Sequence, residues 1–225
     1  MKRPAREWAV RVCLLLAGLA VAHFGVALFL QTGLGSDPFN VFVQGVFRAS
    51  PWPEWAAMTH GRTHLLISLV LLAAIFVLDR SQVGVGTVLC MALGGPIIDL
   101  YAPLLAPLIH SGLPLAARLA AVAAGCLILA FGMTMVITSK AGTGPNDLVA
   151  VVLAARMKKP FGPVRVAVDL AFAGAGFALG GVVGLGTLVC AFLVGPAAQL
   201  FFPVSERICS AALRRFSPTT IDPSR

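Results

Sequence analysis

The sequence carries the same pattern twice. The stretch from Phe24 to Val46 returns 107 positions later, from Phe131 to Leu153, and the stretch from Val83 to Pro96 returns 100 positions later, from Val183 to Pro196. The matching positions are mostly glycines, prolines and small hydroxyl residues, so the duplication preserves backbone geometry as well as hydrophobicity. We therefore expect two copies of one unit to form a single fold.

Composition places this fold in a membrane. Hydrophobic residues make up 58% of the chain and charged residues 12%, with a mean hydropathy of +0.91, whereas a soluble surface needs about a quarter of the residues charged. The apolar runs can cross a hydrocarbon core of ~30 Å and lack the alternation of barrel strands, which predicts an all-α polytopic protein in contact with the lipid bilayer. These runs are Val12 to Leu30, Leu65 to Leu78, Val83 to Leu108, Leu119 to Thr138 and Val166 to Phe202.

The net charge of +8 has a topological explanation. The basic residues lie at the chain ends and in short connections rather than on one soluble face, which is typical of topology determinants and of anchors for anionic lipid head groups. We therefore expect no nucleic-acid partner. The same distribution predicts that the N- and C-termini are cytoplasmic.

Each copy reads as a long helix, a short helix and two further long helices. We expect repeat 1 over residues 1–112 and repeat 2 over 113–203. Residues 204–225 should form a cytoplasmic interfacial helix and tail, because one apolar stripe there lies opposite three arginines. The start of the chain resembles a signal peptide, but its apolar run continues to Leu30, so we expect it to remain as the first span. The expected helices are Trp8 to Gln31, Pro38 to Arg48, Thr63 to Leu78, Val83 to Leu108, Pro114 to Thr138, Pro145 to Met157, Val164 to Gly181 and Leu185 to Phe202.

The short helices are the most informative elements. A helix over Pro38 to Arg48 measures roughly 16 Å, about half of the membrane core. Pro38 and Pro145 suit the first helical position, and the glycine-rich segments before them favour extended or left-handed backbone. Irregular backbone at membrane depth is tolerated where protein or a water-filled cavity covers it, so we expect these turns to line a cavity.

Two topologies remain open. If the short helices turn back, the chain has six spans and an inverted three-plus-three repeat. If they cross with the help of the extended residues, it has eight spans and a parallel four-plus-four repeat. The lysines and arginines fit both arrangements. Helix length favours the inverted repeat, with three long helices and one re-entrant helix in each copy.

A substrate site is predicted where the two short helices begin. A helix N-terminus carries unpaired N–H groups and partial positive charge, which favours an anion or a carboxylate. The alternative is that these helix starts are simply capped and bind nothing. Paired interrupted segments in two halves of a membrane protein nevertheless indicate a transport site. The candidate substrate-binding residues are Gly35, Ser36, Asp37, Asn40, Lys140, Gly142, Thr143, Asn146 and Asp147.

Three ionisable residues inside apolar runs are candidates for proton or ion coupling: His23, Asp99 and Asp169. Asp169 lies four residues after Arg165, so a structural ion pair explains it equally well. Asp99 corresponds to Gln199 in the second copy, which indicates a polar partner in the interior. His23 has the alternative of an ordinary hydrogen-bonded interior histidine.

No enzyme motif is found, and we expect no catalytic residue, no cofactor and no metal centre. The five cysteines lack metal-ligand spacing and read as small core residues. Cys90 and Cys190 occupy equivalent positions, which leaves a functional thiol pair as an alternative.

The segments GLGSDPFNVFVQG and AGTGPNDLVAVVL, with the GLGT element and the trailing GP, resemble the YczE/YitT-type family of bacterial integral membrane proteins over nearly the whole chain. The resemblance implies a multi-pass protein of the bacterial cytoplasmic membrane and supplies no catalytic residues.

The sequence favours a small-solute transporter or permease, with an anionic solute among the options and the site between the repeats. One alternative is a non-transporting membrane scaffold or regulator of a partner enzyme, acting through the cytoplasmic loop and tail. Another is a membrane-embedded enzyme acting on lipid. Self-association into a homo-oligomer is compatible with all three.

Overall fold

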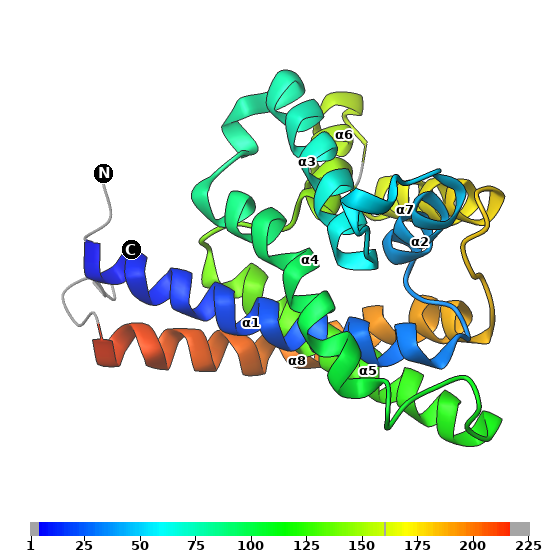
Figure 1. Cartoon of the computed structure of the whole chain (residues 1–225). Helices are drawn as coiled ribbons and strands as arrows, with labels where there is room; N and C mark the ends of the chain where they lie inside the picture. The colour runs from blue at the N-terminus through cyan, green and yellow to red at the C-terminus, as the bar shows by residue number, and fades with distance from the viewer. Residues whose placement is uncertain (1–4, 160, 217–225) are drawn as a thin grey trace.

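A computed structural model describes residues 5–159 and 161–216 (Figure 1). Within these ranges the chain is helical, with eight α-helices, two 3-10 turns and no strand. The α-helices are α1 (Ala5–Thr32), α2 (Pro38–Ala49), α3 (His60–Asp79), α4 (Val85–Leu105), α5 (Leu115–Ser139), α6 (Pro145–Met157), α7 (Phe161–Ala178) and α8 (Leu185–Phe216). The predicted all-α class is confirmed.

Five of these helices are long and apolar enough to cross a membrane: α1, α3, α4, α5 and α8. The chain is therefore a multi-pass membrane protein. The 12-residue α2 and 13-residue α6 are the short helices expected after Pro38 and Pro145. α7 has 18 residues and is not among the five in the part of the chain described.

The helices form two groups (Figure 1). In one bundle, α5 packs against α1 and α8, and α1 also contacts α4. In the other, α2 packs on α7, α3 on α6, and the two pairs adjoin. The contact between α3 and α4 is the main helix-to-helix link between the α1/α4/α5/α8 bundle and the α2/α3/α6/α7 bundle. Each half of the chain contributes two helices to each bundle.

The helices α1 and α5 cross in close backbone contact. A Cβ on Gly25 would lie 2.5 Å from the carbonyl oxygen of Gly125, and a Cβ on Gly18 would lie 2.8 Å from that of Gly132. Small residues allow two helix backbones to touch in this way. The later residue of α1 meets the earlier residue of α5, so the two helices run antiparallel.

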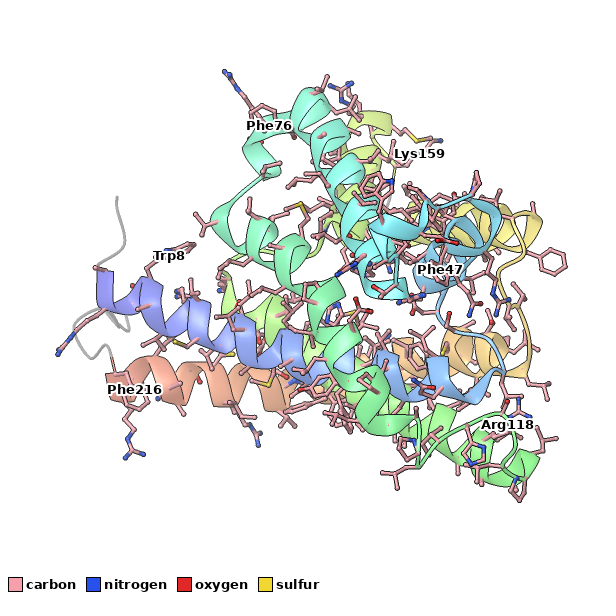
Figure 2. The ribbon with its side chains drawn as sticks, viewed as in Figure 1. Trp8, Phe47, Phe76, Arg118, Lys159 and Phe216 are labelled. Atoms are coloured by element: carbon pink, nitrogen blue, oxygen red, sulfur yellow. The ribbon has the colours of Figure 1, made fainter. Side chains whose placement is uncertain are left out.

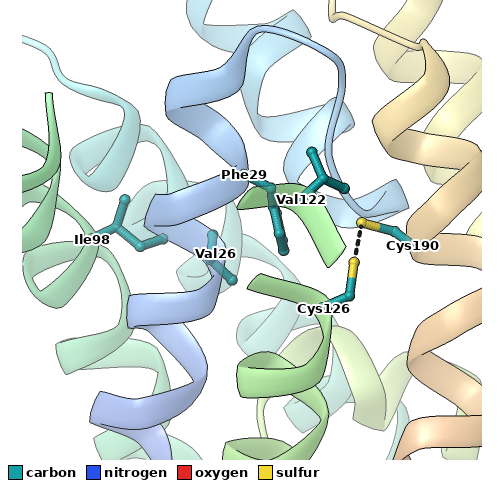
Figure 3. Close-up of a cluster of buried hydrophobic side chains, with 6 residues drawn as sticks. All are labelled: Val26, Phe29, Ile98, Val122, Cys126 and Cys190. Atoms are coloured by element: carbon teal, nitrogen blue, oxygen red, sulfur yellow. Dashed lines mark hydrogen bonds between the residues drawn. The ribbon is translucent and has the colours of Figure 1, made fainter. Parts of the chain in front are cut away.

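A buried cluster lies beside this crossing (Figure 3). Phe29 and Val122 pack there with Cys126 and Cys190, whose sulfur atoms are 3.1 Å apart. Cys90 belongs to a different cluster, so the close thiol pair differs from the one suggested by the repeat. Four of the five cysteines are buried, as expected of core residues, whereas Cys13 is exposed.

Both predicted interruptions are present and share their local structure. The Thr32 hydroxyl donates to Phe29 O and accepts from Leu34 N. The Ser139 hydroxyl, 107 positions later, donates to Val136 O and accepts from Ala141 N. The residues that follow, Gly33 and Lys140, both take left-handed backbone, with φ of 66° and 55°. Each helix therefore stops at a hydroxyl that satisfies backbone groups freed by the turn.

Each turn docks on the other half of the chain. Leu34 O accepts a hydrogen bond from Gly186 N at 2.8 Å, which places the first turn on the start of α8. Gly142 lies against the backbone of Gly86 and Thr87, which places the second turn on the start of α4. Gly35 and Gly142 have positive φ angles of 99° and 154°, which favour glycine. The absence of a side chain at these two positions allows the close backbone contacts.

The expected separate helix at residues 204–216 is absent, because α8 runs unbroken through Pro203 to Phe216. Its last part is held by α5. The Ser205 hydroxyl lies 2.7 Å from that of Thr134, and Cys209 Sγ lies 3.3 Å from Thr138 Oγ1. The apolar stripe itself, with Val204, Ile208 and Phe216, is exposed and lies beside this packing face.

Candidate functional site

A chain of polar side chains begins at the start of α2. The Asp37 carboxylate accepts from Asn40 N at 3.2 Å and from Asn40 Nδ2 at 2.7 Å. This orientation leaves Asn40 Oδ1 as an acceptor, and His60 Nε2 lies 3.0 Å from it. His60 is therefore held with its proton on Nε2. Asp37 itself occupies the position at which the helix start was expected to attract an anion.

The start of α6 is held differently. Arg165 on α7 donates to Asp147 at 2.6 Å and to Asp169 at 2.9 Å. Asn146 Nδ2 also donates to Asp147 at 3.1 Å. The predicted ion pair of Asp169 with Arg165 is confirmed, and Asp147 makes it a triad.

The two polar groups are linked through α7, because α2 packs on α7 and α6 also contacts α7. Together they hold three carboxylates and one guanidinium. Neither helix start therefore offers the uncompensated positive charge that a free anion would need.

Aromatic rings and two histidines lie beside this region. Phe39 packs between His64 and Phe172, with ring centroids 5.1 and 5.4 Å apart. His23 meets His64 edge-on at 5.7 Å, and its Nδ1 lies 2.9 Å from Leu19 O. His23 is thus a hydrogen-bonded, half-buried residue. His64 is buried, and its Nδ1 has no hydrogen-bond partner among the described residues.

A first cavity of about 210 Å³ lies between α1, α2, α3 and α4; we call it the Asp99 cavity. Asp99 accepts from Thr59 Oγ1 at 2.5 Å and from Gly61 N at 2.9 Å, so it caps the start of α3. The cavity is lined by Ala27, Leu30, Gln31, Gln44, Phe47, Arg48, His60, Ile98, Asp99 and Ala102.

A second cavity of about 250 Å³, the Lys140 cavity, lies where α5 ends and α6 begins. It is lined by Thr87, Ile137, Lys140, Gly142, Thr143 and Leu148. The two cavities lie towards opposite ends of α1 and α5, because one includes Gln31 near the end of α1 and the other includes Lys140 after the end of α5. Figure 2 shows these ends: Arg118 marks the first, and Trp8 and Phe216 mark the second.

The structure distributes the predicted substrate-binding residues over several places. Lys140, Gly142 and Thr143 line the Lys140 cavity. Gly35 and Ser36 are buried under the start of α8 and line neither described cavity. The first turn is therefore packed rather than open.

Of the coupling candidates, Asp99 has the interior partners expected, in Thr59 and Gly61. Its counterpart Gln199 is exposed, and no interior partner for it is found among the residues that the structure describes. Sequence reasoning missed His60 and His64, which the repeat does not duplicate. Their positions near the start of an apolar run, four residues apart, were the available signal.

The chain is similar to bacterial proteins without an assigned function. Residues 9–203 match the sequence model of a family described as a family of unknown function, DUF6198. An uncharacterized protein of Haemophilus influenzae is 29% identical over 200 residues, covering 88% of this chain and 85% of that protein. The uncharacterized membrane protein YczE of Bacillus subtilis is 24% identical over 212 residues, covering 93% and 94%. The uncharacterized protein YyaS of the same species is 25% identical over 193 residues, covering 84% and 91%. No solved structure matches the chain.

Proposed function

The chain belongs to the family of unknown function DUF6198, and we propose that it carries a small polar solute across the bacterial cytoplasmic membrane. The observation that carries this proposal is the pair of cavities towards opposite ends of the α1–α5 pair, with polar side chains between them. From the Asp99 cavity these run through His60 and Asn40 to Asp37. The Arg165 triad lies at the start of α6, and its helix α7 also packs on α2.

An internal repeat of inverted orientation supports the proposal. The matched helices α1 and α5 run antiparallel, and each glycine of the crossing meets the counterpart of the other: Gly18 with Gly132, and Gly25 with Gly125. A two-fold axis in the membrane plane produces this reciprocal contact, whereas a parallel repeat would leave matched helices parallel. The matched hydroxyl turns at Thr32 and Ser139 agree with it.

Departure from this symmetry supports alternating access. Gly95 on α4 touches the backbone of Gly61 on α3, closing the seam between the bundles. Its counterpart Gly195 on α8 has nothing within 4 Å of a Cβ position. In the second half, α7 packs on α2 through Gly176 and Gly45 instead. We infer that the α3–α4 seam opens and a matching α7–α8 seam closes when the two bundles rock against each other.

The cytoplasmic side is assigned to the end at which α1 begins and α8 ends. Basic residues gather there, and the rule that positive residues stay inside places that end in the cytoplasm. The group comprises Arg6, Arg11, Lys140, Arg207, Arg214 and Arg215.

Exchange assays in proteoliposomes test the proposal. Purified full-length protein is reconstituted, and uptake of radiolabelled glycine, acetate, methylammonium and urea is compared with protein-free vesicles. The variant Ala102→Phe fills the Asp99 cavity and should abolish the uptake seen with the natural protein. Ala106→Phe is its control, since Ala106 is exposed and lines neither described cavity.

Uptake of one probe class that Ala102→Phe abolishes and Ala106→Phe preserves supports a carrier. Equal uptake by both variants, or none above protein-free vesicles for any probe, contradicts it. In the second case a stable cytoplasmic partner that co-purifies in a fixed ratio would instead favour the scaffold alternative.

A further inference from the structure

The Asp99 cavity has an acceptor side. Asp99 uses two hydrogen-bonding positions, on Thr59 and Gly61, and an ionised carboxylate offers about four. His60 holds its proton on Nε2 towards Asn40 Oδ1, so its other ring nitrogen, Nδ1, is an acceptor. Gln31 donates Nε2 to Ala102 O at 2.9 Å, which leaves its amide oxygen for a ligand.

The donor side comes from one face of α2, where Gln44 and Arg48 lie one turn apart. The Gln44 amide oxygen accepts from Val182 N at 2.7 Å, so its NH₂ group remains as a donor. Arg48 Nη1 donates to Gly180 O at 3.0 Å, and a guanidinium carries five N–H groups. Both side chains are therefore held by the segment after α7 with donors left for a ligand.

Charge and size restrict the ligand further. The lining contains one acid, Asp99, and one base, Arg48. A ligand with one positive and one negative group can pair with both side chains, whereas a ligand with a single charge can pair with only one of them. The volume of about 210 Å³ equals that of about seven water molecules at ~30 Å³ each.

We propose that the Asp99 cavity binds a small zwitterion, with its ammonium group towards Asp99 and His60 and its carboxylate towards Arg48 and Gln44. This inference rests on the proposed transport function and names its solute class. A free anion, the class suggested by the helix starts alone, matches only the α2 side of the cavity.

Titration calorimetry on the purified full-length protein tests this assignment. Glycine is the zwitterionic probe, and acetate and methylammonium are the single-charge probes. Glycine should bind tightest. Arg48→Gln should weaken glycine binding at least about tenfold, as expected when one charge-assisted pair is lost. Arg62→Gln is the matched control, because Arg62 is an exposed arginine that bonds Ala56 O and Ala57 O and does not line the cavity.

Selectivity separates this role from a structural one. Asp99→Asn keeps one oxygen to accept from Gly61 N and places an NH₂ group where the second oxygen accepts from the Thr59 hydroxyl, which can turn to accept instead. The variant removes the charge, so acetate should then compete as well as glycine. Arg48→Gln should make methylammonium the better ligand relative to acetate. Unfolding would weaken all three probes alike and could not produce these opposite changes.

Acetate or methylammonium binding the natural protein as well as glycine overturns the assignment, and so does the absence of glycine binding. Glycine binding with the expected selectivity but without vesicle uptake keeps the zwitterion site and rejects the carrier. Vesicle uptake of acetate, methylammonium or urea that glycine does not compete with keeps the carrier and rejects the zwitterion site.

Discussion

The guanidinium of Arg165 joins two helices by donating to Asp147 on α6 at 2.6 Å while it holds Asp169 on its own helix at 2.9 Å. Replacing it with methionine leaves two carboxylates without their cation in a membrane protein's interior. We expect Arg165→Met to lower the free energy of unfolding by roughly 2 kcal/mol, the cost of losing a hydrogen bond to a charged group. Thermal unfolding in detergent measures this loss.

The double variant Arg165→Met/Asp147→Asn is the control, because it removes one of the stranded charges and should recover part of the stability. Equal destabilisation of the single and double variants would show that the charge pair is not the cause.

A substitution at Gly195 tests the proposed rocking of the bundles without disturbing the structure described here. Nothing lies within 4 Å of a Cβ at Gly195, so Gly195→Leu should unfold at the same temperature as the natural protein. If the α7–α8 seam closes during transport as the α3–α4 seam is closed here, the added side chain should slow vesicle uptake at least about tenfold, a barrier increase of about 1.4 kcal/mol.

Gly84→Leu is the matched control. Gly84 is equally unobstructed and lies directly before α4, on neither helix of the α7–α8 seam, so uptake should not change. Equal effects of the two substitutions on uptake would contradict the exchange of seams.

The α1–α5 crossing should be intolerant of side chains. In Gly25→Leu the new atoms meet the backbone of Gly125 and Leu129, which cannot rotate away as a side chain could. We expect a loss of about 3 kcal/mol in unfolding free energy, the upper range for overpacking. Ala124→Leu on the exposed face of α5 should change stability little. Chemical denaturation in mixed micelles distinguishes the two, and matched stabilities would argue against backbone contact.

The sulfur atoms of Cys126 and Cys190 are close enough to react with an added oxidant such as diamide. Oxidation should join α5 to α8 by a disulfide and lower the intact mass by about 2 Da as two thiol hydrogens are lost. Cys90→Ser should leave this mass change intact, whereas Cys190→Ser should remove it. A mass change that persists in Cys190→Ser would assign the reaction to another pair.

The positions of the helices follow from local signals, and their partners do not. Proline and glycine punctuation predicted the interruptions before Pro38 and Pro145, and α6 has the predicted bounds, because these residues act on the backbone beside them. The helix α2 packs on α7 through Gly45 and Gly176. Their sequence surroundings do not distinguish these two glycines from the others, so the contact could not be predicted.

The polar contacts show the same division. The Arg165–Asp169 pair was predictable because both residues lie on one helix face. Asp99 is paired with Thr59, 40 positions earlier, and His60 with Asn40, 20 positions earlier. Such contacts depend on how the two bundles meet, which no local periodicity encodes.

At 1.5 Å per residue, the 32 residues of α8 measure about 48 Å, well beyond a hydrocarbon thickness of ~30 Å. Its final turns therefore extend beyond the hydrocarbon core, while Ser205 stays bonded to Thr134 on α5. Pro196 and Pro203 each remove one backbone hydrogen bond within α8 and are the places where it can bend. A partner that grips the last turns of α8 would therefore act on the α5–α8 contact from outside the bilayer core.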